Sequence, residues 1–82
     1  MDFEDVTITA HAAERMEARG IQEQEVMGVL ANPEQILLLR NGRIVAQAVR
    51  GRFLVRVIVD VDRTPPEIVT AYRTSKIEKY RN

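Results

Sequence analysis

The sequence has no cysteine, which excludes disulfide bonds, thiol nucleophiles and cysteine-ligated zinc. It has one histidine, which is too few for a histidine-rich metal site. No apolar run approaches the roughly 18 residues that a membrane-spanning helix needs. The acidic N-terminus lacks the basic and apolar regions of a signal peptide. We therefore expect a cytoplasmic protein with no membrane contact, no metal and no cofactor.

A net charge is also absent, because the 12 acidic and 12 basic residues cancel. Residues 1–34 carry eight acids and two bases, whereas residues 35–82 carry four acids and ten bases. Ten of the 12 bases are arginines, whose planar guanidinium groups bind phosphate through two hydrogen bonds. This composition favours a basic surface for nucleic acid. Alternatively, the two halves neutralise each other across the fold.

The most apolar segment, RFLVRVIVDV at residues 52–61, alternates with a period of two and is rich in β-branched residues. This pattern predicts a β-strand, and its apolar character favours a central place in the sheet. Arg56 interrupts one face, which makes that face the candidate working surface. The other face is wholly apolar and is expected to lie on the core; it consists of Phe53, Val55, Val57, Val59 and Val61.

Two helices are predicted before this strand. Thr9 is a suitable N-cap for a helix that extends through Arg19, and Gly20 is suited to end it. A second helix is expected at about residues 23–31, because the following Asn32-Pro33 excludes further helical backbone. Residues 1–8 are expected to be an extended lead-in.

Asn41-Gly42 predicts a type I′ turn between two strands. Residues 74–82 form a short basic tail that could include a helical turn. The expected fold is a single α+β domain over residues 1–82, with two N-terminal helices on one face of a four-stranded antiparallel sheet, in the order ααββββ. The four strands are expected at residues 35–40, 43–49, 52–61 and 67–73.

The fourth strand carries residues that suit phosphate binding. Alternation places Val69 and Ala71 under the helices, and it places a second set opposite them, on the face of Arg56. That second set is Ile68, Thr70, Tyr72 and Thr74, with Arg73 and Lys76 at the rim. Arginine clamps phosphate, hydroxyl groups donate to it, and a tyrosine ring can stack on a base. As structure alone, Tyr72 and Thr70 are ordinary strand residues, and Arg56 could pair with Asp60.

His11, Arg15 and Arg19 share one helix face, because they follow one another at intervals of four. His11 is the side chain that titrates near neutral pH without help. Beside Arg15 it could act as an acid or base next to a bound phosphate. Alternatively, it caps or packs locally. The sequence has no GxSxG, HExxH or phosphate-binding loop, whereas metal-free RNA cleavage needs only a base, cations and an acid.

Several motifs together resemble an uncharacterised prokaryotic family of unknown function, which has a His-x-x-x-Arg-Met helix and a Thr-x-Tyr-Arg-Thr ending. They are ITAHAAERMEARGI, EVMGVLANPEQI, GRIVA, GRFLVRVIV and IVTAYRTSKIEKY, and they cover roughly residues 7–80. That family is distantly similar to the RelE, ParE and BrnT toxins of the barnase–EndoU–colicin–RelE group of ribonucleases. The fold of that group, two helices on a four-stranded antiparallel sheet, agrees with the predicted order.

The resemblance implies a metal-independent endoribonuclease that cleaves RNA and serves as the toxin of a toxin–antitoxin pair, with an antitoxin protein as partner. In its motifs, His11 and Arg15 are the helix positions. The sheet positions that the resemblance implies are Arg56, Thr70 and Tyr72, and the closing basic residues are Arg73 and Lys76. Combined with the reasoning from the residues, the expected catalytic residues are His11, Arg15, Arg56 and Tyr72. The expected substrate-binding residues are Arg19, Thr70, Arg73, Thr74 and Lys76.

Two other functions remain open. One is a non-catalytic nucleic-acid-binding module that uses the same basic half, with His11 in a structural role. The other is a protein-interaction domain whose edge strand at residues 35–40, with Leu37, Leu38 and Leu39 in a row, takes a partner strand or an antitoxin segment. The expected state in solution is a monomer or a small homo-oligomer.

Overall fold

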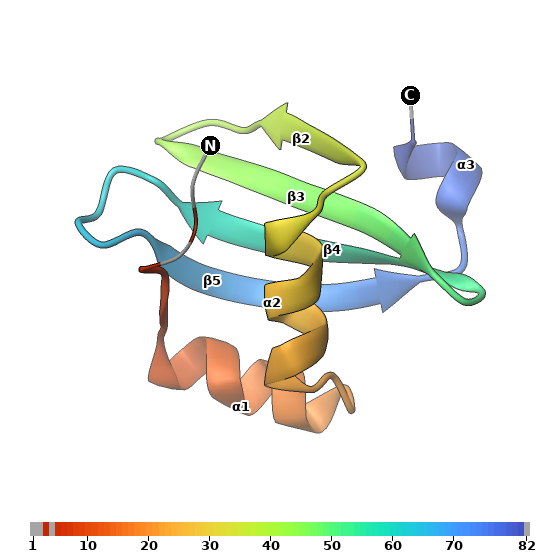
Figure 1. Cartoon of the computed structure of the whole chain (residues 1–82), viewed down its shortest axis with the longest axis horizontal. Helices are drawn as coiled ribbons and strands as arrows, with labels where there is room; N and C mark the ends of the chain where they lie inside the picture. Colours follow the sequence, from red (N-terminus) through yellow and green to blue (C-terminus); the bar gives the residue numbers. More distant parts are fainter. Residues whose placement is uncertain (1–2, 4, 82) are drawn as a thin grey trace.

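The computed structural model describes residue 3 and residues 5–81, and within these it contains one five-stranded sheet and three helices (Figure 1). The sheet has the order β1-β5-β4-β3-β2. No helix in the described part of the chain is long and apolar enough to cross a membrane. The elements are β1 (Thr7–Ile8), α1 (Ala10–Ala18), α2 (Glu23–Ala31), β2 (Gln35–Leu38), β3 (Arg43–Arg50), β4 (Phe53–Asp60), β5 (Glu67–Thr74) and α3 (Ile77–Tyr80).

Helix α1 begins and ends where the sequence predicts. The Thr9 hydroxyl accepts a hydrogen bond from the backbone N–H of Ala12 at 3.0 Å, as an N-cap does. The same hydroxyl donates to the Ile68 carbonyl at 3.2 Å, which fixes the start of α1 to β5. Gly20 has a positive φ of 68°, a conformation that glycine adopts without strain and that ends the helix. The local sequence therefore determines where α1 begins and ends, and the Thr9 hydroxyl also attaches its first turn to β5.

The predicted sheet is confirmed in its central part. β4 lies in the middle, antiparallel to β3 and β5, and the predicted turn residues Asn41 and Gly42 both have positive φ, 62° and 72°. The expected four strands and ααββββ order differ in detail. β1, which was expected to be lead-in, pairs parallel to β5, and the Thr7 N–H donates to the Pro66 carbonyl at 2.8 Å. Two residues are too short a strand to produce an alternating pattern.

The main core lies between the sheet and helices α1 and α2. It includes Ala12 and Met16 of α1, Val26, Val29 and Leu30 of α2, and inward residues of β3, β4 and β5. The opposite face is not open. Leu54 and Val45, on the other side of β4 and β3, are 1% and 0% exposed. The four-residue helix α3 lies over part of that face, because Tyr80 contacts both Gln47 and Arg56 there (Figure 1).

A β-bulge in β5 reverses part of the predicted alternation. Ile58 pairs with Thr70 but the next residue, Val59, pairs with Ile68, so Val69 is an extra residue without a partner in β4. Ile68 is consequently buried in the core, and Val69 is only half-buried. The prediction that Val69 faces the helices and Ile68 faces away was therefore wrong.

Two residues near the Gly51 turn also depart from expectation. Phe53, predicted to lie in the core, is 39% exposed, because it is the first residue of β4 and lies beside the turn. Arg73, predicted at the rim of the Arg56 face, pairs with Val55, which belongs to the core face. Its side chain accordingly reaches α1. Phe53 and Arg73 thus occupy the same face of the sheet, near its end.

Candidate nucleic-acid interface

The first group of predicted site residues is the α1 row, consisting of His11, Arg15 and Arg19, all of which are exposed. Arg15 Nε donates a hydrogen bond to His11 Nε2 at 3.1 Å. The contact places a ring nitrogen of His11 beside a guanidinium group on an exposed helix face. An imidazole next to a guanidinium group is a pair that can take a proton and bind an anion.

Arg19 and Arg73 join the end of α1 to β5 by reciprocal hydrogen bonds. Arg19 donates to the Thr70 hydroxyl at 3.1 Å and to the Ala71 carbonyl at 2.9 Å. Arg73 donates in the opposite direction, to the carbonyls of Arg19 at 3.0 Å and Gly20 at 2.9 Å. A cation at these last carbonyls also opposes the negative end of the helix dipole. Thr70 is thereby connected to the α1 row around the edge of β5.

The second group is the Arg56 cluster, consisting of Arg56, Gln47, Tyr72 and Tyr80 on the opposite face of the sheet. Arg56 Nε donates to Gln47 Oε1 at 2.8 Å, and its Nη1 donates to the Tyr72 hydroxyl. The Arg56 guanidinium carbon lies 4.3 Å from the centroid of the Tyr80 ring and 5.6 Å from that of Tyr72. Arg56 is therefore engaged by three neighbouring side chains.

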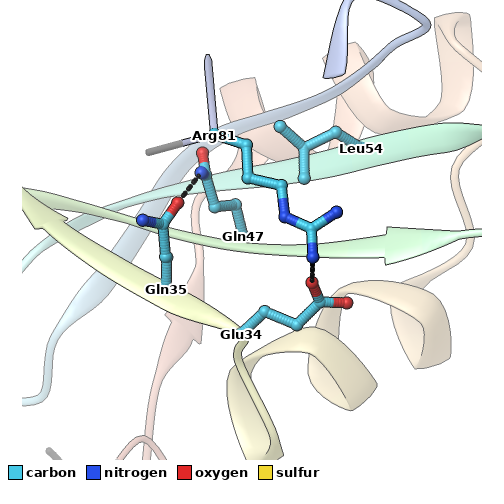
Figure 2. Close-up of a pocket in the computed structure, with 5 residues that line it drawn as sticks. All are labelled: Glu34, Gln35, Gln47, Leu54 and Arg81. Carbon is cyan, nitrogen blue, oxygen red and sulfur yellow. Dashed lines mark hydrogen bonds and ion pairs between the residues drawn. The ribbon is translucent and has the colours of Figure 1, made fainter. Parts of the chain in front are cut away.

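Gln47 connects this cluster to the C-terminal segment and is 1% exposed. Its Nε2 donates to Gln35 Oε1 at 2.7 Å and to the Tyr80 carbonyl at 2.9 Å. Figure 2 shows the small polar pocket beside it, across which Arg81 forms an ion pair with Glu34 at 3.6 Å. A buried amide with every polar atom bonded is costly to disturb, so these contacts hold α3 on the sheet.

The structure does not bring the two groups together. Because Thr9 contacts Ile68 and Arg19 contacts Thr70, α1 runs along β5 in the strand direction, with His11 near the start of β5. His11 lies about 12 Å along the helix from Arg19, since each residue rises 1.5 Å. Among the described residues, no hydrogen bond or ring contact joins His11 or Arg15 to the Arg56 cluster.

The remaining predicted residues lie after the end of β5. The Thr74 hydroxyl accepts a hydrogen bond from the backbone N–H of Lys76 at 3.1 Å, which closes a turn before α3. Lys76 is exposed. In the described part of the chain, no group of three or more His, Cys, Asp or Glu residues could hold a metal ion.

Sequence reasoning missed one exposed aromatic residue in this region. Phe53 was assigned to the core by its parity, yet the Arg73 guanidinium carbon lies 5.7 Å from its ring centroid at the surface. Arg50 pairs directly with Phe53 across the β3–β4 turn. The signal available in the sequence was the position of Phe53 next to a glycine turn and directly after Arg50 and Arg52.

The fold and these contacts define a small α+β protein with exposed arginines along its α1–β5 edge. A family model described as Domain of unknown function (DUF4258) matches residues 8–73, and the chain belongs to this family. The predicted membership of a family of unknown function is thereby confirmed, whereas the more distant similarity to RelE-type toxins stays a prediction. No curated protein and no solved structure matches the chain.

Proposed function

We propose that this protein is a metal-independent endoribonuclease, with His11 as its acid–base residue and Arg15 and Arg19 as its phosphate-binding residues. The observation that carries the proposal is the 3.1 Å hydrogen bond from Arg15 Nε to His11 Nε2 on an exposed helix face. Both side chains are accessible to a large substrate.

The chemistry is a transesterification within one ribonucleotide. His11 Nε2 takes the proton of the 2′-hydroxyl, the 2′-oxygen attacks phosphorus, and the bond from phosphorus to the 5′-oxygen breaks. The departing oxygen takes a proton from His11 or from water. Arg15 and Arg19 stabilise the charge that develops on the phosphoryl oxygens. Phosphate binding would also draw Arg15 away from Nε2, which frees the imidazole lone pair to act as the base.

This proposal gives Arg56 and Tyr72 a supporting role in place of the catalytic role that the sequence suggested. Arg56 donates to Gln47 and to the Tyr72 hydroxyl, and these two hydrogen bonds connect neighbouring strands on the opposite face of the sheet. Toxin action and an antitoxin partner belong to the proposal as its biological setting, since a cytoplasmic ribonuclease without an inhibitor would arrest growth.

The test is induced expression of the wild type, His11→Ala and Arg15→Gln, followed by growth and by the integrity of total RNA. The wild type is expected to arrest growth and to yield fragments with 5′-hydroxyl ends, also in a purified reaction with EDTA. His11→Ala should reduce cleavage by about 10²- to 10⁴-fold, the usual contribution of an acid–base group. Glu17→Gln, exposed on α1 but outside the row, is the matched control and should cleave normally.

Intact RNA with the folded wild type would contradict the ribonuclease. Binding of RNA without cleavage would support a nucleic-acid-binding module. A second candidate function, docking of a partner strand at β2, is favoured by Leu38, which is 83% exposed on that edge strand, and by Leu39, which is 44% exposed. Normal growth with intact RNA, together with self-association or co-purification of a protein that Leu38→Lys releases, would favour this candidate.

A further inference from the structure

Phe53 lies exposed at the end of a path of arginines that begins in the α1 row. We propose that Phe53 is a base-stacking platform for single-stranded RNA, whose phosphates are bound by the arginines on either side of it. This inference rests on the proposed function, and it specifies the form of RNA that the same surface accepts.

The Phe53 ring is exposed and has a guanidinium group beside it. It is 39% exposed, and Arg73 holds its guanidinium carbon 5.7 Å from the ring centroid. Arg73 is itself fixed by two hydrogen bonds to the end of α1. An aromatic ring beside a cation is the arrangement that proteins use to stack an unpaired base and bind its phosphate. Tyr72 is less exposed than Phe53, and its hydroxyl is bonded to Arg56 on the opposite face of the sheet.

The cations between His11 and Phe53 follow one another along the α1–β5 edge, with Arg15 and Arg19 one helical turn apart on the same face of α1. Arg15 contacts His11, the Arg19 backbone accepts from Arg73, and Arg73 lies over Phe53. Beyond Arg73 is an open hollow in which a nucleotide could lie. It is lined by Gly20, Gln22, Gln24, Glu25, Arg50 and Arg73. The path therefore connects the proposed cleavage residues with the proposed stacking residue.

These arginines are not neutralised by carboxylates. In the described residues, the ion pairs are those of Arg63 with Asp60 and of Arg81 with Glu34. The guanidinium groups along the path instead donate to an imidazole nitrogen, a hydroxyl or carbonyls, none of which is a carboxylate; they are Arg15, Arg19, Arg50 and Arg73. A phosphate backbone supplies the missing negative charge. The form must be single-stranded, because bases in a duplex are stacked on each other and cannot reach a ring.

The test uses Phe53→Trp, because the chain has no tryptophan and the new indole would be the sole one. The probe is a short single-stranded 2′-O-methyl oligonucleotide, which lacks the 2′-hydroxyl needed for cleavage. Binding should quench the indole fluorescence at position 53. Leu38→Trp is the matched control. Leu38 is also exposed but lies in β2 and pairs with Ile44, at the end of β3 opposite to Arg50, so its indole should not be quenched.

Affinity is then compared between the wild type and Phe53→Leu, which keeps an apolar side chain and removes the ring. The expected loss is about tenfold, the size of one base–aromatic stack. Folding of each variant is checked by circular dichroism, and a folded Phe53→Leu with wild-type affinity would overturn the proposal. So would binding of the oligonucleotide that leaves the indole at position 53 unquenched.

Two further outcomes separate this inference from the proposed function. If the oligonucleotide quenches the indole but natural RNA is not cleaved, the stacking role of Phe53 would be supported and the ribonuclease proposal would be rejected. Cleavage of RNA that is unaffected in Phe53→Leu, without quenching, would reject the platform alone. Equal affinity and equal quenching with single-stranded DNA would overturn the assignment to RNA, and binding of duplex RNA with the same quenching would overturn the single-strand requirement.

Discussion

Three neighbouring side chains contact the guanidinium group of Arg56. It donates to Gln47 and Tyr72, and the Tyr80 ring covers its guanidinium carbon at 4.3 Å. Gln47 is almost fully buried. If the Arg56 side chain were removed, the Gln47 side-chain oxygen would therefore be left buried without this hydrogen-bond donor. At the scale of the residue, the structural role of Arg56 is thus stronger than a role in binding phosphate.

Replacement of Arg56 should consequently affect stability before it affects cleavage. Arg56→Met keeps much of the aliphatic stem but leaves the Gln47 oxygen unbonded, which should lower the free energy of unfolding by about 1–3 kcal/mol. Urea denaturation measures the change. Lys76→Met, at an exposed position after β5, is the matched control and should alter the free energy of unfolding by less than about 0.5 kcal/mol. Unchanged stability with lost cleavage would return Arg56 to the catalytic residues.

The sequence predicted which candidate residues are neighbours within one helix or between paired strands, but it did not predict how the helices and the sheet faces group them. The interval of four placed His11, Arg15 and Arg19 on one face, and Arg15 indeed contacts His11. Strand parity placed Tyr72 beside Arg56, which is also observed. Parity could not show that α3 folds back over this face, because that depends on the contacts of Tyr80 with Gln47 and Arg56.

At the scale of the element, the ends of helices and strands were predictable where a local side chain sets them. Thr9 caps α1, Gly20 ends it, and Asn41-Gly42 turns between β2 and β3. The bulge at Val69 was not predictable, since it arises from the pairing of β5 with β4 rather than from its own residues. β1 was missed for the same reason, as its two residues become a strand through pairing with β5.

Substitution of individual glycines by alanine should change the free energy of unfolding by different amounts. Gly42 has a φ of 72°, and a Cβ there would lie 1.8 Å from Asp62 Oδ2, so Gly42→Ala must both strain the turn and displace Asp62. Gly51 has a φ of 62° but nothing within 4 Å, so Gly51→Ala should cost only the strain of the left-handed backbone, about 1 kcal/mol. Gly42→Ala should cost more than that.

Gly28 is the control position, where substitution by alanine should stabilise the protein rather than destabilise it. It lies exposed inside α2 with nothing within 4 Å of a new Cβ, so Gly28→Ala should raise the free energy of unfolding by about 0.5–1 kcal/mol. Thermal or urea unfolding of the three variants gives the order. If Gly51→Ala proved more destabilising than Gly42→Ala, the close approach of Asp62 to the turn would be wrong.

At the scale of the whole molecule, the fold mixes the two oppositely charged halves of the sequence. Arg15 and Arg19 are the two bases of residues 1–34, yet they lie along β5, next to Arg73 of the basic half. Neutralisation between the halves is limited, since of the two ion pairs in the described residues one joins them, that of Arg81 with Glu34. A neutral chain can therefore present a local row of cations that its net charge conceals.

This distribution predicts how binding should respond to salt. If the four arginines of the path each bind one phosphate of single-stranded RNA, the slope of log K against log salt concentration should be about −3, since each phosphate contributes about −0.7. Arg15→Gln should make the slope less steep by about 0.7 and weaken binding to all sequences alike. Arg43→Gln is the control, because Arg43 is exposed at the opposite end of β3 from Arg50. Titration of a labelled 2′-O-methyl oligonucleotide at several KCl concentrations gives both slopes. An equal decrease for the two variants would mean that phosphate is attracted by the charge of the whole molecule rather than bound along the α1–β5 edge.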